Sequence, residues 1–299
     1  MRKSGLMLSP LAAVLAFSAA CILFPDPGDD EGWRRIPERD GTAPRETRTE
    51  PALRPASGTE FRETLDLRKG GTLSLENDFG NVAIAGWDRN TVDIAAAAAV
   101  AAARGIARTT SSYRRYVPDV EVRETGGGLM VRTRTFEGTG TPPAVDYRVR
   151  VPDSVVLTGI RLSEGDLTVS DVFGKLEASV DQGDLLVKNF SGAVDVTVGT
   201  GDADVEVLDL REGDTITVTC RRGNIVLRLE PGVGAIVEAD APRGRVRSDF
   251  DLGVELPAAT VKGWIGEGGP NIILRAPNGR IEIVKIKTFG RDASEAPGR

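Results

Sequence analysis

The sequence predicts an all-β protein whose middle is a parallel β-solenoid, a β-helix-like coil of about 18 residues per turn. The first observation is a row of glycines at intervals of nine residues. After each glycine, polar and apolar residues alternate with the two-residue period of a strand. The second is composition: 35 glycines and only 5% aromatic residues suit a turn-rich β-architecture better than a helix bundle. The repeat glycines are Gly165, Gly174, Gly183, Gly192 and Gly201.

Nine-residue units are compatible with two arrangements. An antiparallel meander would join its strands by tight hairpins. A parallel solenoid would bend at each glycine and stack every second unit. The phrase Gly165-Asp166-Leu167 recurs 18 residues later as Gly183-Asp184-Leu185, and Gly201-Asp202 continues the series. Such second-neighbour likeness favours the solenoid, in which these residues stack about 4.8 Å apart; the meander is the alternative.

The alternation also predicts which side chains face the core. A slip of one residue would exchange the two faces of every strand, so the register is well specified. We expect the apolar series to point inward: Leu167, Val169, Leu176, Ala178, Leu185, Val187, Val194, Val196, Val205 and Val207. We expect the polar series to point outward: Thr168, Lys175, Glu177, Lys188, Asp195, Asp204 and Glu206.

The flanks of the repeat are less regular. Alternating segments predict strands before it at 72–76, 81–85, 91–95, 120–123, 129–134, 145–151 and 155–162. Alanine is the best helix former, so the alanine-rich stretch predicts a short helix from about Ala96 to Arg108. After Gly201, the same order of glycine, polar and apolar residues recurs at Gly213, Gly223, Gly244 and Gly279, and predicts further turns.

The N-terminus has the pattern of an export signal. Two basic residues precede an apolar run from Leu6 to Phe24, with small residues ahead of Cys21. This resembles a bacterial lipoprotein signal at residues 1–20 with Cys21 as the lipid site; ordinary cleavage or an uncleaved anchor are alternatives. Residues 21–57 are rich in Pro, Gly and charge, which predicts a flexible tether. The folded domain is expected at 58–288 and a disordered tail at 289–299.

Composition excludes several kinds of chemistry. The chain has no histidine, so Ser-His-Asp and Cys-His triads and His-ligated zinc are excluded. The formal net charge of −6 argues against nucleic acid as a partner. Two cysteines predict no disulfide framework. If Cys21 carries lipid, Cys220 is expected to be a small buried apolar residue.

Four phrases of the chain resemble the bacterial "putative adhesin" family, also called domain of unknown function 4097. They span residues 60–287 and comprise the opening at 70–94, the segment VDYRVRVPDSVVL at 145–157, the Gly-Asp strand repeats, and the closing KGWIGEGGPNIILRAPNGRIEI at 262–283. Two positions depart from the pattern, Ala276 and Arg280. The resemblance implies a right-handed β-solenoid-like fold outside the cytoplasm and no established activity.

Four candidate sites follow. Asp166, Asp184 and Asp202 would form a carboxylate ladder that calcium could bridge, unless each bonds its own turn. The loop Gly266–Gly269 is expected to be a tight corner rather than a phosphate cradle, because a strand follows it. Outward Glu177, Asp195, Asp204 and Glu206 could supply an acid pair for sugar cleavage. The outward polar side chains could bind a repetitive partner: Thr168, Lys175, Glu177, Lys188, Asp195, Thr197 and Thr217.

Together these observations predict an exported, lipid-anchored cell-envelope protein, or a secreted one, that is not an enzyme and needs no cofactor. It would act as a binding, adhesion or scaffolding module whose partner is an envelope protein or a glycan. The alternatives are a carbohydrate-active enzyme on a β-helix and a sensor domain stabilised by calcium.

Overall fold

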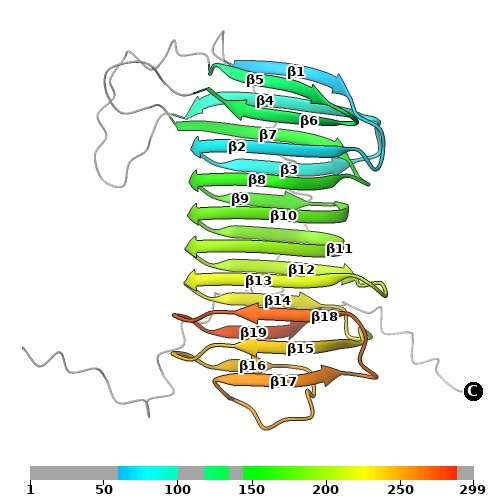
Figure 1. Cartoon of the computed structure of the whole chain (residues 1–299), viewed down its shortest axis with the longest axis vertical. Helices are drawn as coiled ribbons and strands as arrows, with labels where there is room; N and C mark the ends of the chain where they lie inside the picture. The colour runs from blue at the N-terminus through cyan, green and yellow to red at the C-terminus, as the bar shows by residue number, and fades with distance from the viewer. Residues whose placement is uncertain (1–59, 100–117, 135–143, 288–299) are drawn as a thin grey trace, which may run out of the picture. The chain divides into compact units, whose positions relative to one another are not determined.

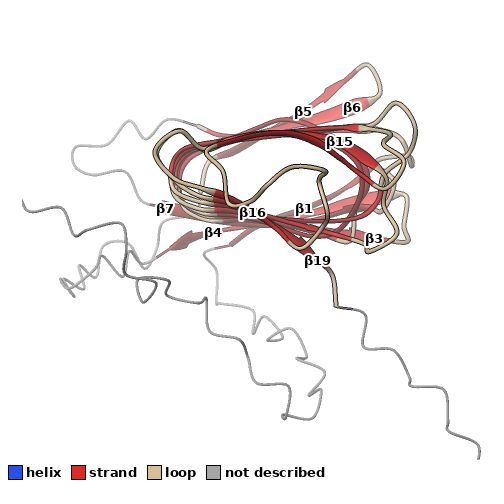
Figure 2. Cartoon of the chain, turned by 90° about the horizontal axis from the view of Figure 1, so that it is seen from below, coloured by secondary structure: helices blue, strands red, loops and turns tan. Residues whose placement is uncertain are grey.

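The structure, a computed structural model, describes residues 60–99, 118–134 and 144–287. All of these residues fall within one compact unit. Every regular element in the described residues is a β-strand, and no helix is present among them. The 19 strands form a single mixed sheet that closes nearly completely on itself, like a flattened barrel (Figures 1 and 2). The all-β prediction is therefore confirmed.

The flattened sheet has two broad faces, which we name after their central strands. In the β12 face, consecutive neighbours are hydrogen-bonded in the following order. The strands are β1 (Glu60–Asp66), β4 (Thr91–Ala99), β7 (Ala144–Pro152), β3 (Val82–Trp87), β9 (Leu167–Ser170), the first part of β11 (Leu185–Thr200), β12 (Ala203–Asp209), β14 (Ile225–Leu229), β19 (Ile281–Lys285) and β16 (Val246–Ser248).

The β13 face lies opposite and is built in the same way. Its order is β5 (Val120–Thr125), β6 (Gly128–Thr133), β2 (Thr72–Phe79), β8 (Val156–Glu164), β10 (Phe173–Gln182), the second part of β11, β13 (Thr215–Arg222), β18 (Asn271–Arg275), β15 (Ala235–Asp240) and β17 (Thr260–Ile265). Figure 2 looks along the stack and shows the two faces lying opposite each other.

Strand β11 turns from one face into the other. Its residues before Asn189 pair with β9 and β12, and those from Gly192 onward pair with β10 and β13. Asn189 has a left-handed φ of 50°, and Asp171, one layer earlier in the stack, has a φ of 59°. Asparagine and aspartate tolerate this conformation better than other non-glycine residues, so a corner can be made there without glycine.

The core fills the space between the faces with the apolar series expected from alternation. All ten residues predicted to face inward, from Leu167 to Val207, are buried. The largest fully buried side chains are Tyr147 and Phe190. Valine, isoleucine and leucine dominate because both inner faces must pack across a narrow space with few aromatics. The prediction of the inward register is confirmed.

The predicted class, a right-handed parallel β-solenoid, is wrong for the molecule as a whole. In the middle, from β8 to β14, paired strands are parallel and not a meander, and Leu185 lies between Leu167 and Ala203, each 18 residues away. Both ends, however, contain antiparallel pairs: β1–β4, β4–β7, β5–β6 and β15–β17. The result is a mixed, barrel-shaped sheet, because the repeat covers only the central strands.

Chain order is also broken at both ends. The last two strands, β18 and β19, insert between β13 and β15 and between β14 and β16 (Figure 1). At the other end, β2 and β3 stack on β8 and β9, so that Leu73 lies opposite Leu157. These pairings connect distant segments, which a short sequence period does not encode.

The alanine-rich helix is also wrong where the structure describes it. Ala95–Ala99 belong to β4, which pairs with β1 on one side and with β7 on the other. Ala96 is fully buried there. Pairing on both edges satisfies the backbone of this segment, and that tertiary context overrides the helix propensity of alanine. The remainder of the predicted helix lies outside the described residues.

Candidate binding surface

The three aspartates of the expected carboxylate ladder do lie in one row, along a corner of the barrel. The Asp184 N–H donates to Asp166 Oδ1 at 2.9 Å, and the Asp202 N–H donates to Asp184 Oδ1 at 2.8 Å. Asn81 and Asn224 extend the row at its two ends. Each side chain thus caps the turn of the neighbouring layer rather than its own turn. The described residues contain no group of three or more His, Cys, Asp or Glu side chains suited to hold a metal.

The glycines beside this row have a steric role. A Cβ on Gly201 would lie 2.0 Å from the carbonyl oxygen of Gly183, and φ at Gly201 is +136°. The stacked backbones therefore approach too closely for any side chain. Among the predicted turn glycines, positive φ is found at Gly165, Gly183, Gly192, Gly201, Gly213 and Gly223, whereas Gly174, Gly244 and Gly279 lie at close backbone approaches without it.

The residues of the predicted binding face are divided between two surfaces. Lys175 and Glu177 on β10, and Asp195 and Thr197 on β11, lie on the β13 face. Thr168 on β9 and Lys188 in the first part of β11 lie on the β12 face. The predicted acid pairs are divided in the same way, with Asp204 and Glu206 on β12. These four acids therefore do not converge on one cleft.

The outward side chains of the β13 face form straight rows across the strands. Ser179 on β10 lies opposite Thr197 on β11, which in turn lies opposite Thr219 on β13. A second row contains Glu177, Asp195 and Thr217 in the same order. Because neighbouring parallel strands are about 4.8 Å apart, the rows present short polar groups at a constant spacing. We call these six residues the hydroxyl–acid rows.

Like charges face each other within these rows. Glu177 is directly opposite Asp195, an arrangement that is unfavourable between neighbouring strands. Two groups compensate at Glu177: the Lys175 ammonium lies 3.6 Å from its carboxylate, and the Thr158 hydroxyl donates to it at 3.1 Å. The surface therefore combines hydroxyl donors with partly neutralised carboxylates.

On the β12 face, the outward acids of the corresponding strands have different partners. Arg228 on β14 donates two hydrogen bonds to the Asp204 carboxylate, at 3.0 and 2.9 Å. This bidentate pair raises the pKa of Arg228 above its ordinary value, chiefly through the hydrogen bonds to Asp204. Glu206 accepts the backbone N–H of Asn189 at 3.2 Å. These acids are already engaged within the protein, which leaves them less available to a partner.

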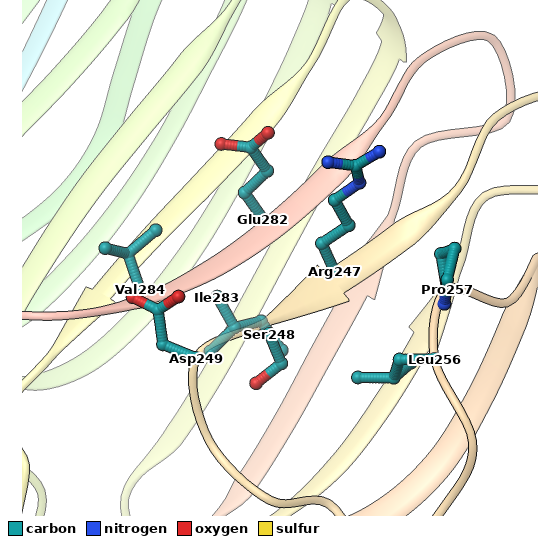
Figure 3. A pocket seen from close by; sticks show the side chains of 8 residues that line it. All are labelled: Arg247, Ser248, Asp249, Leu256, Pro257, Glu282, Ile283 and Val284. Carbon is teal, nitrogen blue, oxygen red and sulfur yellow. The ribbon is translucent and has the colours of Figure 1, made fainter. Parts of the chain in front are cut away.

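A shallow recess of about 430 Å³ lies at one end of the β12 face. Figure 3 shows its lining: Arg247 and Ser248 from β16, Glu282 from β19, and Leu256 and Pro257 from the loop that follows β16. A second recess of about 400 Å³ lies between Glu212–Thr215 and Gly269–Asn271. In this recess, the glycine-rich loop lies beside two acids, Glu212 and Asp214, which would repel phosphate.

Two large apolar side chains are exposed next to each other near the second recess. Ile236 on β15 lies opposite Trp264 on β17, and these side chains are 51% and 55% exposed. Sequence reasoning did not single out this pair. Alternation within each strand could have placed both residues on the outward side, but it could not have shown that the two strands are neighbours.

Cys220 is buried in β13, as expected. Its Sγ donates to the Gly201 carbonyl oxygen at 3.0 Å. Burial, together with the nearby Asp202 carboxylate, raises the pKa of the Cys220 thiol to about 11. A thiol with this pKa is protonated at neutral pH, and it is therefore a poor nucleophile.

The structure also contains a buried polar cluster that sequence reasoning missed. Asn77 is 3% exposed, and its amide donates to the Val145 carbonyl oxygen at 2.9 Å. The Thr133 hydroxyl donates to Asn77 Oδ1 at 3.0 Å and lies 2.7 Å from the Tyr147 hydroxyl. The sequence signal that could have revealed this cluster is a polar residue, Asn77, at an inward position of a strand. Only the long-range strand pairing shows which groups Asn77 bonds.

The predicted signal at 1–20, the lipid site Cys21, the tether at 21–57 and the tail at 289–299 lie outside the described residues. Within the part of the chain that the structure describes, there is no helix with the length and apolarity needed to cross a membrane.

Comparison with known proteins gave matches among solved structures only. No family model matches the chain, and no curated protein matches it. A "putative cell adhesion protein" from Clostridium sporogenes is 12% identical, covers 76% of this chain and 100% of its own, and has a TM-score of 0.42. A "putative adhesin" from Bacteroides fragilis is 10% identical over 77% of this chain and 99% of its own, with a TM-score of 0.27.

A third similar structure is described as a "putative lipid binding protein" from Parabacteroides distasonis. It is 10% identical over 77% of this chain and 98% of its own, with a TM-score of 0.24. Structures described as adhesins are thus among those similar to this chain, and the resemblance to the adhesin family itself stays a prediction.

Proposed function

We propose that the protein is a non-enzymatic binding module of the bacterial cell envelope, and that the hydroxyl–acid rows of the β13 face contact its partner. The observation that carries this proposal is the register Ser179–Thr197–Thr219, which repeats a hydroxyl group once per strand. A ligand with its own short repeat, such as an envelope glycan, can engage several of these groups at once. Many weak polar contacts then add up through multivalency.

The two faces differ in the way that this proposal requires. On the β13 face, the row side chains are short and lie side by side on adjacent strands. On the β12 face, the outward acids at the same height bond to Arg228 and to the backbone of Asn189. A partner that binds through half-buried hydroxyl groups and the exposed Asp195 carboxylate would therefore use the β13 face.

The proposal can be tested with purified protein and isolated bacterial envelope polysaccharide. Thr197→Arg places a long charged side chain in the middle of the rows and should weaken binding at least about tenfold, because it blocks neighbouring groups on both sides. Thr168→Arg is the matched control, because Thr168 is an outward threonine on the opposite face. Binding would be measured by sedimentation with the polysaccharide.

Equal binding by both variants and the native protein would contradict the assignment to this face. Binding that disappears after protease treatment of whole envelopes, but not after glycan digestion, would identify an envelope protein as the partner instead of a glycan.

Attachment to the membrane through a lipid on Cys21 is part of the same proposal. It rests on the apolar run that ends near this cysteine and on the small residues ahead of it. Cys21→Ser should move the protein from the membrane fraction to the soluble fraction of the cell. Retention of the variant in the membrane fraction would favour the uncleaved anchor.

A further inference from the structure

Strand β1 ends the β12 face of the sheet, and one of its edges has no strand beside it among the described residues (Figure 1). The other edge pairs with β4 from Glu60↔Ala97 to Asp66↔Thr91. The Leu67 N–H donates to the Asn90 carbonyl oxygen across this pair. Main-chain groups alternate in direction along an antiparallel strand, so those of Arg62, Thr64 and Asp66 point away from β4.

The outer edge of β1 is complementary in charge to itself. If a second β1 lies antiparallel to the first with Thr64 on the two-fold axis, Arg62 lies opposite Asp66 of the second copy, and Glu60 lies opposite Arg68. Thr64 lies opposite Thr64, another favourable cross-strand pair. Placing Arg62 on the axis instead would set like charges face to face. The charges therefore select one register.

Most of the groups that this pairing needs are accessible, with the exception of the Glu60 side chain. The Arg62 side chain is 52% exposed, and Thr64, Asp66 and Arg68 are exposed. Arg62 forms a 3.3 Å ion pair with Glu60 on its own strand. The Glu60 side chain is only 13% exposed, so pairing across an interface depends chiefly on Arg62 and Asp66, whose side chains reach solvent. Half-buried Phe61 would lie opposite Leu67 of the second copy and lose exposed apolar surface.

The other strands that end the two faces are less suited to such pairing. On the outer edge of β17, the backbone N–H of Trp264 already donates to the Leu252 carbonyl oxygen at 3.4 Å. On β16, Val246 bridges to Ala258. On β5, Glu121 is already bonded to Arg123 and lies within 3.6 Å of both Arg132 and Arg134.

We propose that β1 is a self-association edge, through which two copies of this chain pair as antiparallel strands with Thr64 on the two-fold axis. The pairing continues the sheet of one copy into that of the other and covers an exposed row of backbone donors and acceptors. An uncovered edge of this kind is a site for pairing with another chain.

The test is a charge swap on the full-length chain, with mass measured by sedimentation equilibrium over a range of concentrations. The native protein is expected to approach twice the 31.8 kDa of one chain. Arg62→Asp and Asp66→Arg each create two like-charge pairs per dimer and should raise the dissociation constant about tenfold or more. The double variant R62D/D66R restores opposite charges and should return to within about threefold of the native value.

Arg161→Asp is the matched control. Arg161 is 70% exposed and pairs with Glu76 at 3.4 Å, but it lies on β8, away from the ends of the sheet. This variant should associate like the native protein. A native chain that stays monomeric, single reversals that leave association unchanged, or a double variant that folds but stays as weak as the single variants would each overturn the proposal. Melting temperatures would show that every variant is folded.

A crosslink provides a second, independent measurement. Facing residues of a hydrogen-bonded antiparallel pair have Cα atoms about 5.5 Å apart, within the range of a disulfide. In a Cys21→Ser background, Thr64→Cys should give a disulfide-linked dimer under mild oxidation. Ser170→Cys, in the middle of the β12 face, should not. Absence of the Thr64→Cys crosslink would overturn the register.

Discussion

The middle of the molecule and its two ends find strand partners in different ways. Between β8 and β14, partners in the repeat lie 18 residues apart, as for Leu185 and Leu167, and glycines and Asx side chains stack in continuous rows. At the ends, partners are distant, as for Leu73 and Leu157, and some pairs are antiparallel. The comparison teaches that the middle is stabilised by features repeated in every layer, whereas the ends depend on specific contacts made once.

The largest effect should come from breaking the glycine stack of the middle. Gly201→Ala places a Cβ 2.0 Å from the Gly183 carbonyl oxygen at a φ of +136°. Backbone strain and steric overlap together should lower the free energy of unfolding by about 4 kcal/mol. Chemical denaturation would measure the change.

Gly213→Ala is the control for that experiment. Gly213 also has a positive φ, +95°, but an added Cβ would meet nothing within 4 Å. It should cost only the conformational strain, about 1 kcal/mol. Equal costs at the two positions would show that close stacking does not distinguish the middle of the molecule.

These observations also show how far the sequence specifies this fold. The inward series from Leu167 to Val207 could be predicted because each strand alternates by itself. The antiparallel ends could not, because β4 pairs with β1 and β7, segments that are far from it in the sequence and share no repeat with it. Ala96 shows the limit of local propensity, because alanine favours a helix but this residue lies in a strand of the core.

The candidate surface, too, could be predicted from the sequence only in part. Thr197 and Asp195 could be predicted to face outward, since their neighbours Val196 and Val198 face inward. Their separation from Thr168 and Lys188 could not, because β11 changes face at Asn189. A left-handed asparagine in an otherwise continuous strand leaves no periodic signal in the sequence.

A second prediction concerns the specific contacts of the N-terminal end. Asn77→Ala removes the amide that donates to the Val145 carbonyl oxygen and the acceptor of the Thr133 hydroxyl. Buried groups that lose their partners should lower the free energy of unfolding by about 2 kcal/mol. Thermal unfolding would measure this, with the exposed Asn90→Ala as control, for which we expect a change within about 0.5 kcal/mol. A similar small effect at Asn77 would contradict its role as an anchor of this end.

A third prediction concerns the Asx row of the middle. Asp184→Ala removes the acceptor of the Asp202 N–H and should cost about 1 kcal/mol. Asp184→Asn keeps an acceptor oxygen and reduces repulsion along the row, so it should be close to neutral. Melting both variants and the native protein with and without millimolar calcium would separate the two hypotheses for this row. A calcium-dependent rise of the native melting temperature that Asp184→Asn abolishes would establish a cation site instead of a purely structural row.

The smallest effect is expected at Cys220, where the middle meets the C-terminal end. Burial raises the pKa of its thiol to about 11 from an ordinary value of 9.0, so the folded state binds this proton more tightly than the unfolded state. Its contribution to stability is complete below pH 9 and is lost as the pH rises from 9 through about 11. Cys220→Val keeps a similar volume without an ionisable group, so its melting temperature should fall less than that of the native protein between these pH values. Other groups titrate in the same range, but they are common to both proteins, and the difference therefore isolates the thiol. Parallel curves would mean that the Cys220 thiol has the same pKa in the folded and unfolded states, and they would contradict a desolvated thiol at this position.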